Sequence, residues 1–127
     1  MGDDDTFADV LAANANYVRS FSLGDLEPKA ARGLAVLTCI DSRIEPLAML
    51  GLGPGDAKIL RNAGARVTGD VIRSLFVATQ LLGVERVMVI AHTNCQMSAA
   101  DDDDLHQAIV AAGGPEAPEL PLLAPPS

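Results

Sequence analysis

The chain has 127 residues, 49% of them hydrophobic, which is the size and composition of one globular domain with an aliphatic core. Its formal net charge is -8 and its nine Lys and Arg residues form no cluster, so we expect neither nucleic acid nor an anionic membrane as a partner. No stretch approaches the roughly 20 apolar residues of a membrane span. The acidic start MGDDDTFADV is unlike a signal peptide, so we expect a cytoplasmic protein.

The N-terminal part of the chain predicts a helix followed by a buried strand. Residues 6–21 place apolar side chains at helical spacing, and Thr6 is expected to cap this helix. Only part of the stripe is apolar, so the helix is expected to pack on a partner subunit. Leu34–Cys39 is a continuous apolar run of strand length, which is typical of a strand covered on both faces.

The middle of the chain predicts short elements that end in polar residues. Residues 45–52 favour a short helix with Pro46 in its first turn. Residues 58–60 predict a second strand, which ends in Arg61 and Asn62.

The next part predicts a helix over residues 70–83, capped by Asp70 and ended by Gly83. The apolar face of this helix is formed by Val71, Leu75, Ala78 and Leu82. Residues 85–91 favour a third buried strand, and residues 103–114 a last helix with aspartates in its first turn.

Strands that alternate with helices predict an α/β fold, a single domain with a mostly parallel β-sheet flanked by helices. We expect the strand order 2-1-3, which places the first and third strands side by side. Residues 1–112 are assigned to this domain. Residues 113–127 form a tail with five of the eight prolines, a composition that favours neither helix nor sheet.

Polar residues follow the ends of two strands. Cys39 ends the first strand, and His92 and Cys95 follow the third, so all three are expected at the carboxyl edge of the sheet. Two thiolates and an imidazole suit zinc, and three ligands with an open fourth position are the catalytic pattern. The alternative is that both cysteines are core residues and His92 is a hydrogen-bonded loop residue.

Asp41 and Arg43 lie two residues apart, directly after Cys39. In an extended segment their side chains point the same way and can form an ion pair. The alternative is a surface pair that contributes little. Beside a metal, Asp41 would accept a hydrogen bond from a bound water or become the fourth ligand, and Arg43 would hold its carboxylate.

Three segments resemble the β-class carbonic anhydrases, most closely their short bacterial branch. They are CIDSR (residues 39–43), ILRNAGA (residues 59–65) and AHTNCQM (residues 91–97), and the resemblance spans about the first 112 residues. It implies one Zn2+ per chain, with Cys39, His92 and Cys95 as its ligands.

The resemblance also implies a reaction, a substrate site and an assembly. The reaction is reversible hydration of CO2 to bicarbonate by a zinc-bound hydroxide, in a homodimer or a dimer of dimers. Asp41 and Arg43 become the dyad that gates the fourth zinc site, with Asp41 as fourth ligand in a closed state. Asn62, Ala63 and Gly64 are expected to flank the substrate pocket.

The chain departs from the family pattern at two places. Asn94 and Gln96 stand where members more often have Asp and Gly, and the sequence after residue 112 does not resemble the helix and strand with which members usually continue. Three alternatives stay open: hydrolysis of carbonyl sulfide or carbon disulfide, an inactive zinc-binding member, and a redox protein that uses Cys39 and Cys95 as a dithiol.

Overall fold

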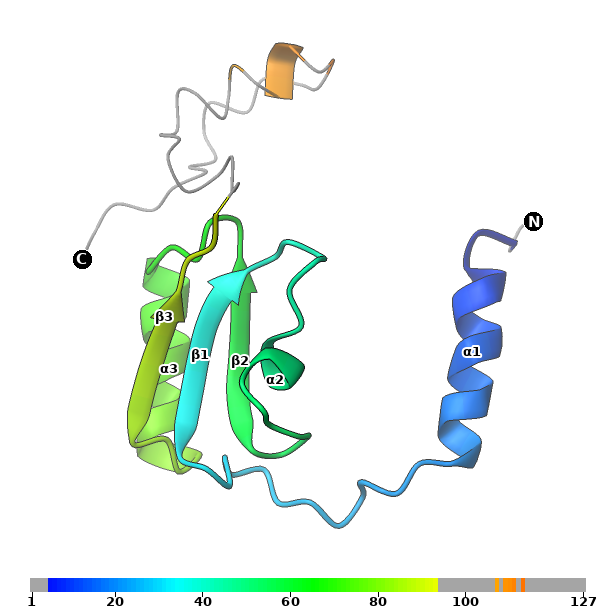
Figure 1. Cartoon of the computed structure of the whole chain (residues 1–127), viewed down its shortest axis with the longest axis horizontal. Coiled ribbons are helices and arrows are strands. Elements are labelled where there is room, and N and C mark those ends of the chain that lie inside the picture. The colour runs from blue at the N-terminus through cyan, green and yellow to red at the C-terminus, as the bar shows by residue number, and fades with distance from the viewer. Residues whose placement is uncertain (1–4, 94–106, 108, 112, 114–127) are drawn as a thin grey trace.

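A three-stranded parallel sheet forms the centre of the molecule (Figure 1). The computed structural model describes residues 5–93, 107, 109–111 and 113. The strands are β1 (Leu34–Cys39), β2 (Ala57–Asn62) and β3 (Arg86–Ile90), in the order β2-β1-β3. This order and direction, with helices beside the sheet, confirm the predicted α/β fold.

β1 is the central strand, and all six of its residues are buried. Its partners set the register: Cys39 lies opposite Asn62 of β2, and Thr38 lies opposite Ile90 of β3. The predicted strand covered on both faces is therefore confirmed. Because parallel strands end on the same side, the segments that follow the three strands meet at one edge.

β3 differs from the prediction of a buried strand. The exposed fractions of Val87, Met88 and Val89 are 42%, 44% and 52%. Among the described residues β3 pairs only with β1, so it is an edge strand and its apolar side chains have fewer neighbours. The continuous apolar run identified a strand but not its place at the edge of the sheet.

α3 (Gly69–Leu81) covers one face of the sheet (Figure 1). Its apolar side chains contact the β1 side chains Ala35 and Leu37. The helical residues in these contacts are those predicted, namely Val71, Leu75 and Ala78, with Leu82 directly after the helix. Gly83 follows with φ of 76°, a left-handed conformation that favours glycine after a helix.

The N-terminal cap of α3 is Thr68, not the predicted Asp70. The Thr68 hydroxyl accepts a hydrogen bond from the backbone N–H of Val71 at 3.3 Å. Asp70 is the second residue of the helix, in the first turn, where the macrodipole favours a negative charge. Both residue types favour helix starts, and the backbone at Thr68 is the one that is extended.

α1 (Ala8–Arg19) lies apart from the sheet and has no buried residue (Figure 1). A single 3-10 turn, η1 (Asp5–Phe7), precedes it, so the predicted Thr6 cap is wrong. α2 (Pro46–Met49) is shorter than predicted and has Pro46 in its first turn, as expected. Among the described residues no helix has the length and apolar character needed to cross a bilayer.

Residues 107 and 109–111 are helical, within the predicted last helix. Most of that helix and nearly all of the tail from residue 113 lie outside the described residues.

Thr68→Ala tests the cap of α3. We expect it to lower the free energy of unfolding by about 1 kcal/mol, because the N–H of Val71 loses its acceptor. Urea denaturation measures this change. The control Asp70→Asn keeps the backbone and removes only a charge, so it should cost a few tenths of a kcal/mol. Equal losses in the two variants would contradict the assignment of the cap.

Candidate active site

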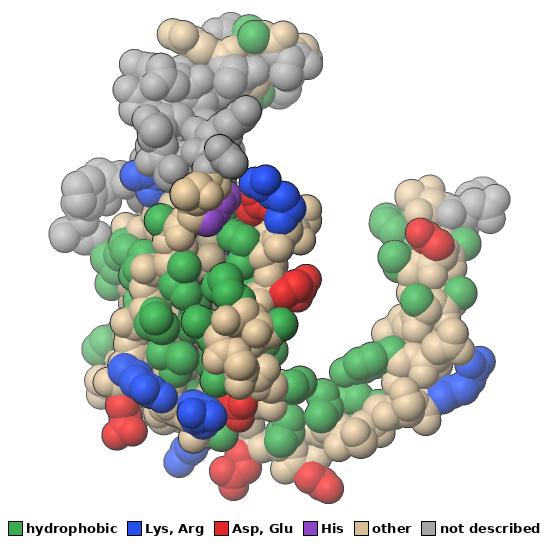
Figure 2. All heavy atoms as spheres, in the orientation of Figure 1, with side chains coloured by type: hydrophobic (Ala, Val, Ile, Leu, Met, Phe, Trp, Pro, Cys, Tyr) green, Lys and Arg blue, Asp and Glu red, His purple; other side chains and the backbone are tan. Residues whose placement is uncertain are grey.

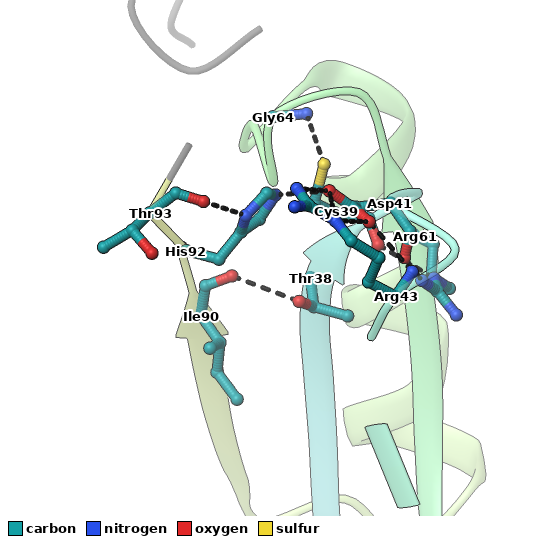
Figure 3. A network of polar contacts seen from close by, with 9 residues as sticks. All are labelled: Thr38, Cys39, Asp41, Arg43, Arg61, Gly64, Ile90, His92 and Thr93. Atoms are coloured by element: carbon teal, nitrogen blue, oxygen red, sulfur yellow. Dashed lines mark hydrogen bonds and ion pairs between the residues drawn. The ribbon is translucent and has the colours of Figure 1, made fainter. Parts of the chain in front are cut away.

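The carboxyl edge of the sheet gathers most of the polar residues that the sequence predicted (Figure 3). Cys39 is the last residue of β1, and Asn62 is the last residue of β2. His92 follows the end of β3 by two residues. Figure 2 shows a histidine side chain beside acidic and basic side chains at this edge of the molecule.

The Cys39 side chain is the buried thiol of the site, and the residue is only 3% exposed. Its Sγ accepts a hydrogen bond from the backbone N–H of Gly64, with an N–S distance of 3.4 Å. An amide donor stabilises the thiolate over the thiol, because it bonds more strongly to the negative charge. The sulfur is thus placed in surroundings that suit a metal ligand.

The loop that carries this amide is closed by the side chain of Asn62. Its Oδ1 accepts from the N–H of Arg66 at 2.8 Å, and its Nδ2 donates to the Arg66 carbonyl at 2.8 Å. Gly64 and Ala65 within the loop have φ of 88° and 55°. Gly64 adopts this left-handed conformation without steric cost, whereas Ala65 is a strained residue held in place by burial.

His92 is oriented by a neighbouring carbonyl. Its Nδ1 lies 2.7 Å from the Thr93 oxygen, which assigns the proton of the neutral ring to Nδ1. Nε2 is then the lone-pair nitrogen. It is buried, has no hydrogen-bond partner among the described residues, and lies 3.8 Å from Oδ2 of Asp41.

Protonation of the ring would give Nε2 a proton to donate. The sulfur of Cys39 is the principal acceptor, followed by the contribution of the Thr93 carbonyl, and together they raise the pKa of His92 above its usual value. Burial opposes this rise, and the Asp41 carboxylate adds to it. Nε2 therefore lies in a place that favours positive charge.

Asp41 and Arg43 form the predicted ion pair, but the segment is a turn and not extended. Arg43 Nε lies 2.9 Å and 3.1 Å from the two carboxylate oxygens of Asp41, and Nη2 lies 2.5 Å from Oδ2. The backbone N–H of Arg43 also donates to Oδ1, at 2.9 Å. The side-chain hydrogen bonds and then the backbone bond hold the pKa of Asp41 well below its usual range.

Contacts with main-chain groups at this edge were not predicted from the sequence. Arg61 donates to two main-chain carbonyls, and the Thr93 carbonyl orients His92. Thr93 acts through its backbone, so its side chain gives no signal in the sequence. Arg61 could have been suspected from its position, a cation at the end of a strand beside the site.

The donor set fits zinc as far as the described residues extend. Cys39 and Nε2 of His92 supply a sulfur and a buried nitrogen, the atom types that zinc prefers. Cys95, the third predicted ligand, lies outside the described residues. Among residues 5–93, 107, 109–111 and 113, no three His, Cys, Asp or Glu side chains are grouped as a metal site requires.

The fold and the site define an α/β protein with a sulfur, nitrogen and carboxylate cluster at the end of a parallel sheet. The chain belongs to the carbonic anhydrase family, whose model matches residues 34–112, more than half of the chain.

The proteins to which it is similar include β-class carbonic anhydrases and carbon disulfide hydrolases. Beta-carbonic anhydrase 1 of Mycobacterium tuberculosis is 41% identical over 101 residues, which are 80% of this chain and 61% of that protein. A carbon disulfide hydrolase of an Acidianus species is 39% identical over 82 residues, 65% of this chain and 40% of the relative.

Among solved structures, carbonic anhydrase from Streptococcus mutans matches with a TM-score of 0.80 and 35% identity. The match covers 100% of this chain and 76% of that one. The match to the mycobacterial relative, in contrast, spans only about three fifths of that protein's length.

Proposed function

We propose that this chain is a zinc-dependent carbonic anhydrase that reversibly hydrates CO2 to bicarbonate. The observation that carries the proposal is the juxtaposition of the Cys39 thiol, Nε2 of His92 and the Asp41–Arg43 pair. They lie at the carboxyl edge of a parallel sheet, within the segment that matches the family model. This combination supports a reaction that needs a metal and an adjacent carboxylate whose pKa is lowered by an ion pair.

In this proposal Cys39, His92 and Cys95 hold one zinc ion per chain. When bound, zinc acts as a Lewis acid that lowers the pKa of a coordinated water from 15.7 to about 7. The chain prepares for this charge with the Gly64 N–H on the Cys39 sulfur and the Thr93 carbonyl at Nδ1 of His92. Both contacts orient the donor atoms before metal arrives.

Asp41 is proposed to orient the attacking water. Arg43 keeps its carboxylate ionised, and an ionised carboxylate only accepts hydrogen bonds. A water that donates to Asp41 has one lone pair directed away, toward the substrate carbon. If the pair with Arg43 opened, the same carboxylate would be available as a fourth ligand that closes the site; its Oδ2 lies 3.8 Å from Nε2 of His92.

Asn62, Ala63 and Gly64 are proposed to flank the substrate pocket. Asn62 ends β2, Ala63 and Gly64 follow it directly, and this loop borders Cys39 through the Gly64 amide. CO2 is small and apolar, so such a wall needs shape and dryness more than hydrogen-bond donors.

A second candidate is hydrolysis of carbon disulfide or carbonyl sulfide. The relative from Acidianus, described as a carbon disulfide hydrolase, favours it. The substrates share one linear geometry, so the same Asp41 and zinc arrangement serves both reactions. An inactive zinc-binding member is the third alternative.

The proposed assembly is a homodimer or dimer of dimers in which α1 packs on a second copy. α1 has no buried residue, yet its apolar side chains recur at helical spacing (Figure 2). The largely exposed apolar side chains are those of Val10, Leu11, Tyr17 and Val18 in the helix, of Phe7 before it and of Phe21 after it. The cytoplasmic location and the absence of nucleic-acid and membrane partners stay predictions.

The activity is tested by stopped-flow CO2 hydration on zinc-loaded protein. We expect turnover that rises with pH from about 6.5 to 9, because the nucleophile is a deprotonated water. Cys39→Ser should reduce turnover to background, whereas its neighbour Ser42→Ala should retain it. Zinc-bound protein that does not hydrate CO2 but releases sulfide from carbon disulfide would favour the second candidate. The absence of both activities would favour the inactive zinc-binding member.

Asp41→Ala tests the orienting carboxylate. We expect kcat/KM to fall by about 100-fold, the loss that misplacement of a reacting group can cause. Asp25→Ala, an exposed carboxylate before β1, is the control and should leave kcat/KM unchanged. Full activity in Asp41→Ala would contradict the proposed role.

Leu11→Asp and Val18→Asp together test the α1 interface. We expect light scattering after size-exclusion chromatography to show monomers, because a charge on the apolar stripe must be desolvated on assembly. Asn16→Asp adds the same charge about 140° around the helix from Leu11 and should leave the oligomer intact. An assembly that resists the double change would place the interface elsewhere.

A further inference from the structure

We propose that Arg61 is a positioning residue that fixes the main chain of the metal-binding turn from the neighbouring strand. Its Nε donates to the carbonyl of Cys39 at 2.9 Å, and its Nη2 donates to the carbonyl of Asp41 at 2.7 Å. One guanidinium thus holds the residue that supplies the sulfur and the residue that supplies the carboxylate (Figure 3). The inference rests on the zinc centre proposed above.

The contacts of Arg61 lie where regular sheet pairing stops. The last paired residues of β1 and β2 are Cys39 and Asn62, and the N–H of Ile40 still donates to the Asn62 carbonyl at 3.0 Å. The chain then turns, and the N–H of Ile44 donates to the Asp41 carbonyl at 3.1 Å. Arg61 adds a second donor to this carbonyl and so ties the turn to β2.

Asp41 is consequently held at two places by two different arginines. Arg43 bonds its carboxylate, whereas Arg61 bonds its backbone carbonyl. The bonds to the carboxylate can break and re-form by rotation of side chains. The backbone bond preserves the position of Asp41 relative to Cys39 during that exchange. Arg43 therefore controls the side-chain conformation of Asp41, whereas Arg61 controls the position of its backbone.

The chemistry of the side chain suits this task. A guanidinium offers donors in a rigid planar fork, which here reaches the carbonyls of Cys39 and Asp41, two residues apart in the chain. A lysine ammonium is a single point charge on a flexible stem and cannot reproduce both bonds in fixed geometry. Groups that orient metal ligands in this indirect way typically change metal affinity by 10- to 100-fold when removed.

The test is a titration of the metal-free full chain with Co2+. Binding is monitored by the cobalt–thiolate absorption, so the measurement does not depend on turnover. We expect Arg61→Met to weaken Co2+ binding by about 10- to 100-fold and to shift the absorption bands, because the Cys39 sulfur loses its fixed position. Arg61→Lys should recover little of the affinity, although it keeps the charge.

Arg86→Met is the matched control. Arg86 also bonds a main-chain carbonyl, that of Arg32 at 3.0 Å, but it begins β3, at the opposite end of the sheet from His92. It should change Co2+ affinity by less than threefold. Urea denaturation of each metal-free variant shows whether it is folded. If Arg61→Met is unfolded, Arg61→Lys alone provides the test, and we expect its affinity for Co2+ to be about tenfold weaker than that of the wild type.

Wild-type affinity and an unshifted spectrum in the folded Arg61 variant would overturn the inference, as would an equal loss in Arg86→Met. Failure of the wild-type chain itself to bind Co2+ or Zn2+ is a different result. It would overturn the proposed zinc centre and, with it, this inference.

Discussion

The parallel pairing of β1 with both of its neighbours is the constraint on which the site depends. It aligns Cys39 with Asn62 and Thr38 with Ile90, so the segments after three strands emerge together. The Thr38 hydroxyl adds a bond to the Ile90 carbonyl at 3.2 Å, inside the sheet. A slip of one residue would turn every side chain of a strand to the other face and separate the Cys39 sulfur from the Gly64 amide.

Main-chain groups orient the polar side chains at this edge. The Gly64 amide faces the Cys39 sulfur, the Thr93 carbonyl faces Nδ1 of His92, and the backbone N–H of Arg43 caps the Asp41 carboxylate. Such groups are fixed by the fold and need no reorganisation when charge develops. The chemistry therefore depends on the backbone of three loops as much as on the side chains that the sequence makes visible.

The apolar surface is distributed unevenly over the molecule. β1 is buried throughout, whereas β3 and the apolar stripe of α1 are largely exposed. The buried core consists mainly of small aliphatic residues, among them Ala35, Ala65 and Ala78.

The sequence by itself determined the local elements and indicated the residues that are proposed for the site. The apolar run ending at Cys39 predicted a buried strand, and the periodicity of residues 70–83 predicted the face that α3 buries. These features are local, because a strand or a helix face is encoded by residues close together in the chain. The pairing of Asp41 with Arg43 was also predicted, although a turn and not an extended segment produces it.

Only the tertiary structure decided the features that depend on residues far apart in the chain. It left β3 at the edge of the described sheet. It also brought Arg61 onto the carbonyls of Cys39 and Asp41. A hydrogen bond to a carbonyl leaves no trace in residue type at the accepting position, so spacing in the sequence cannot reveal it. The register of β1 against β2 creates that contact, and the register is a property of the folded sheet.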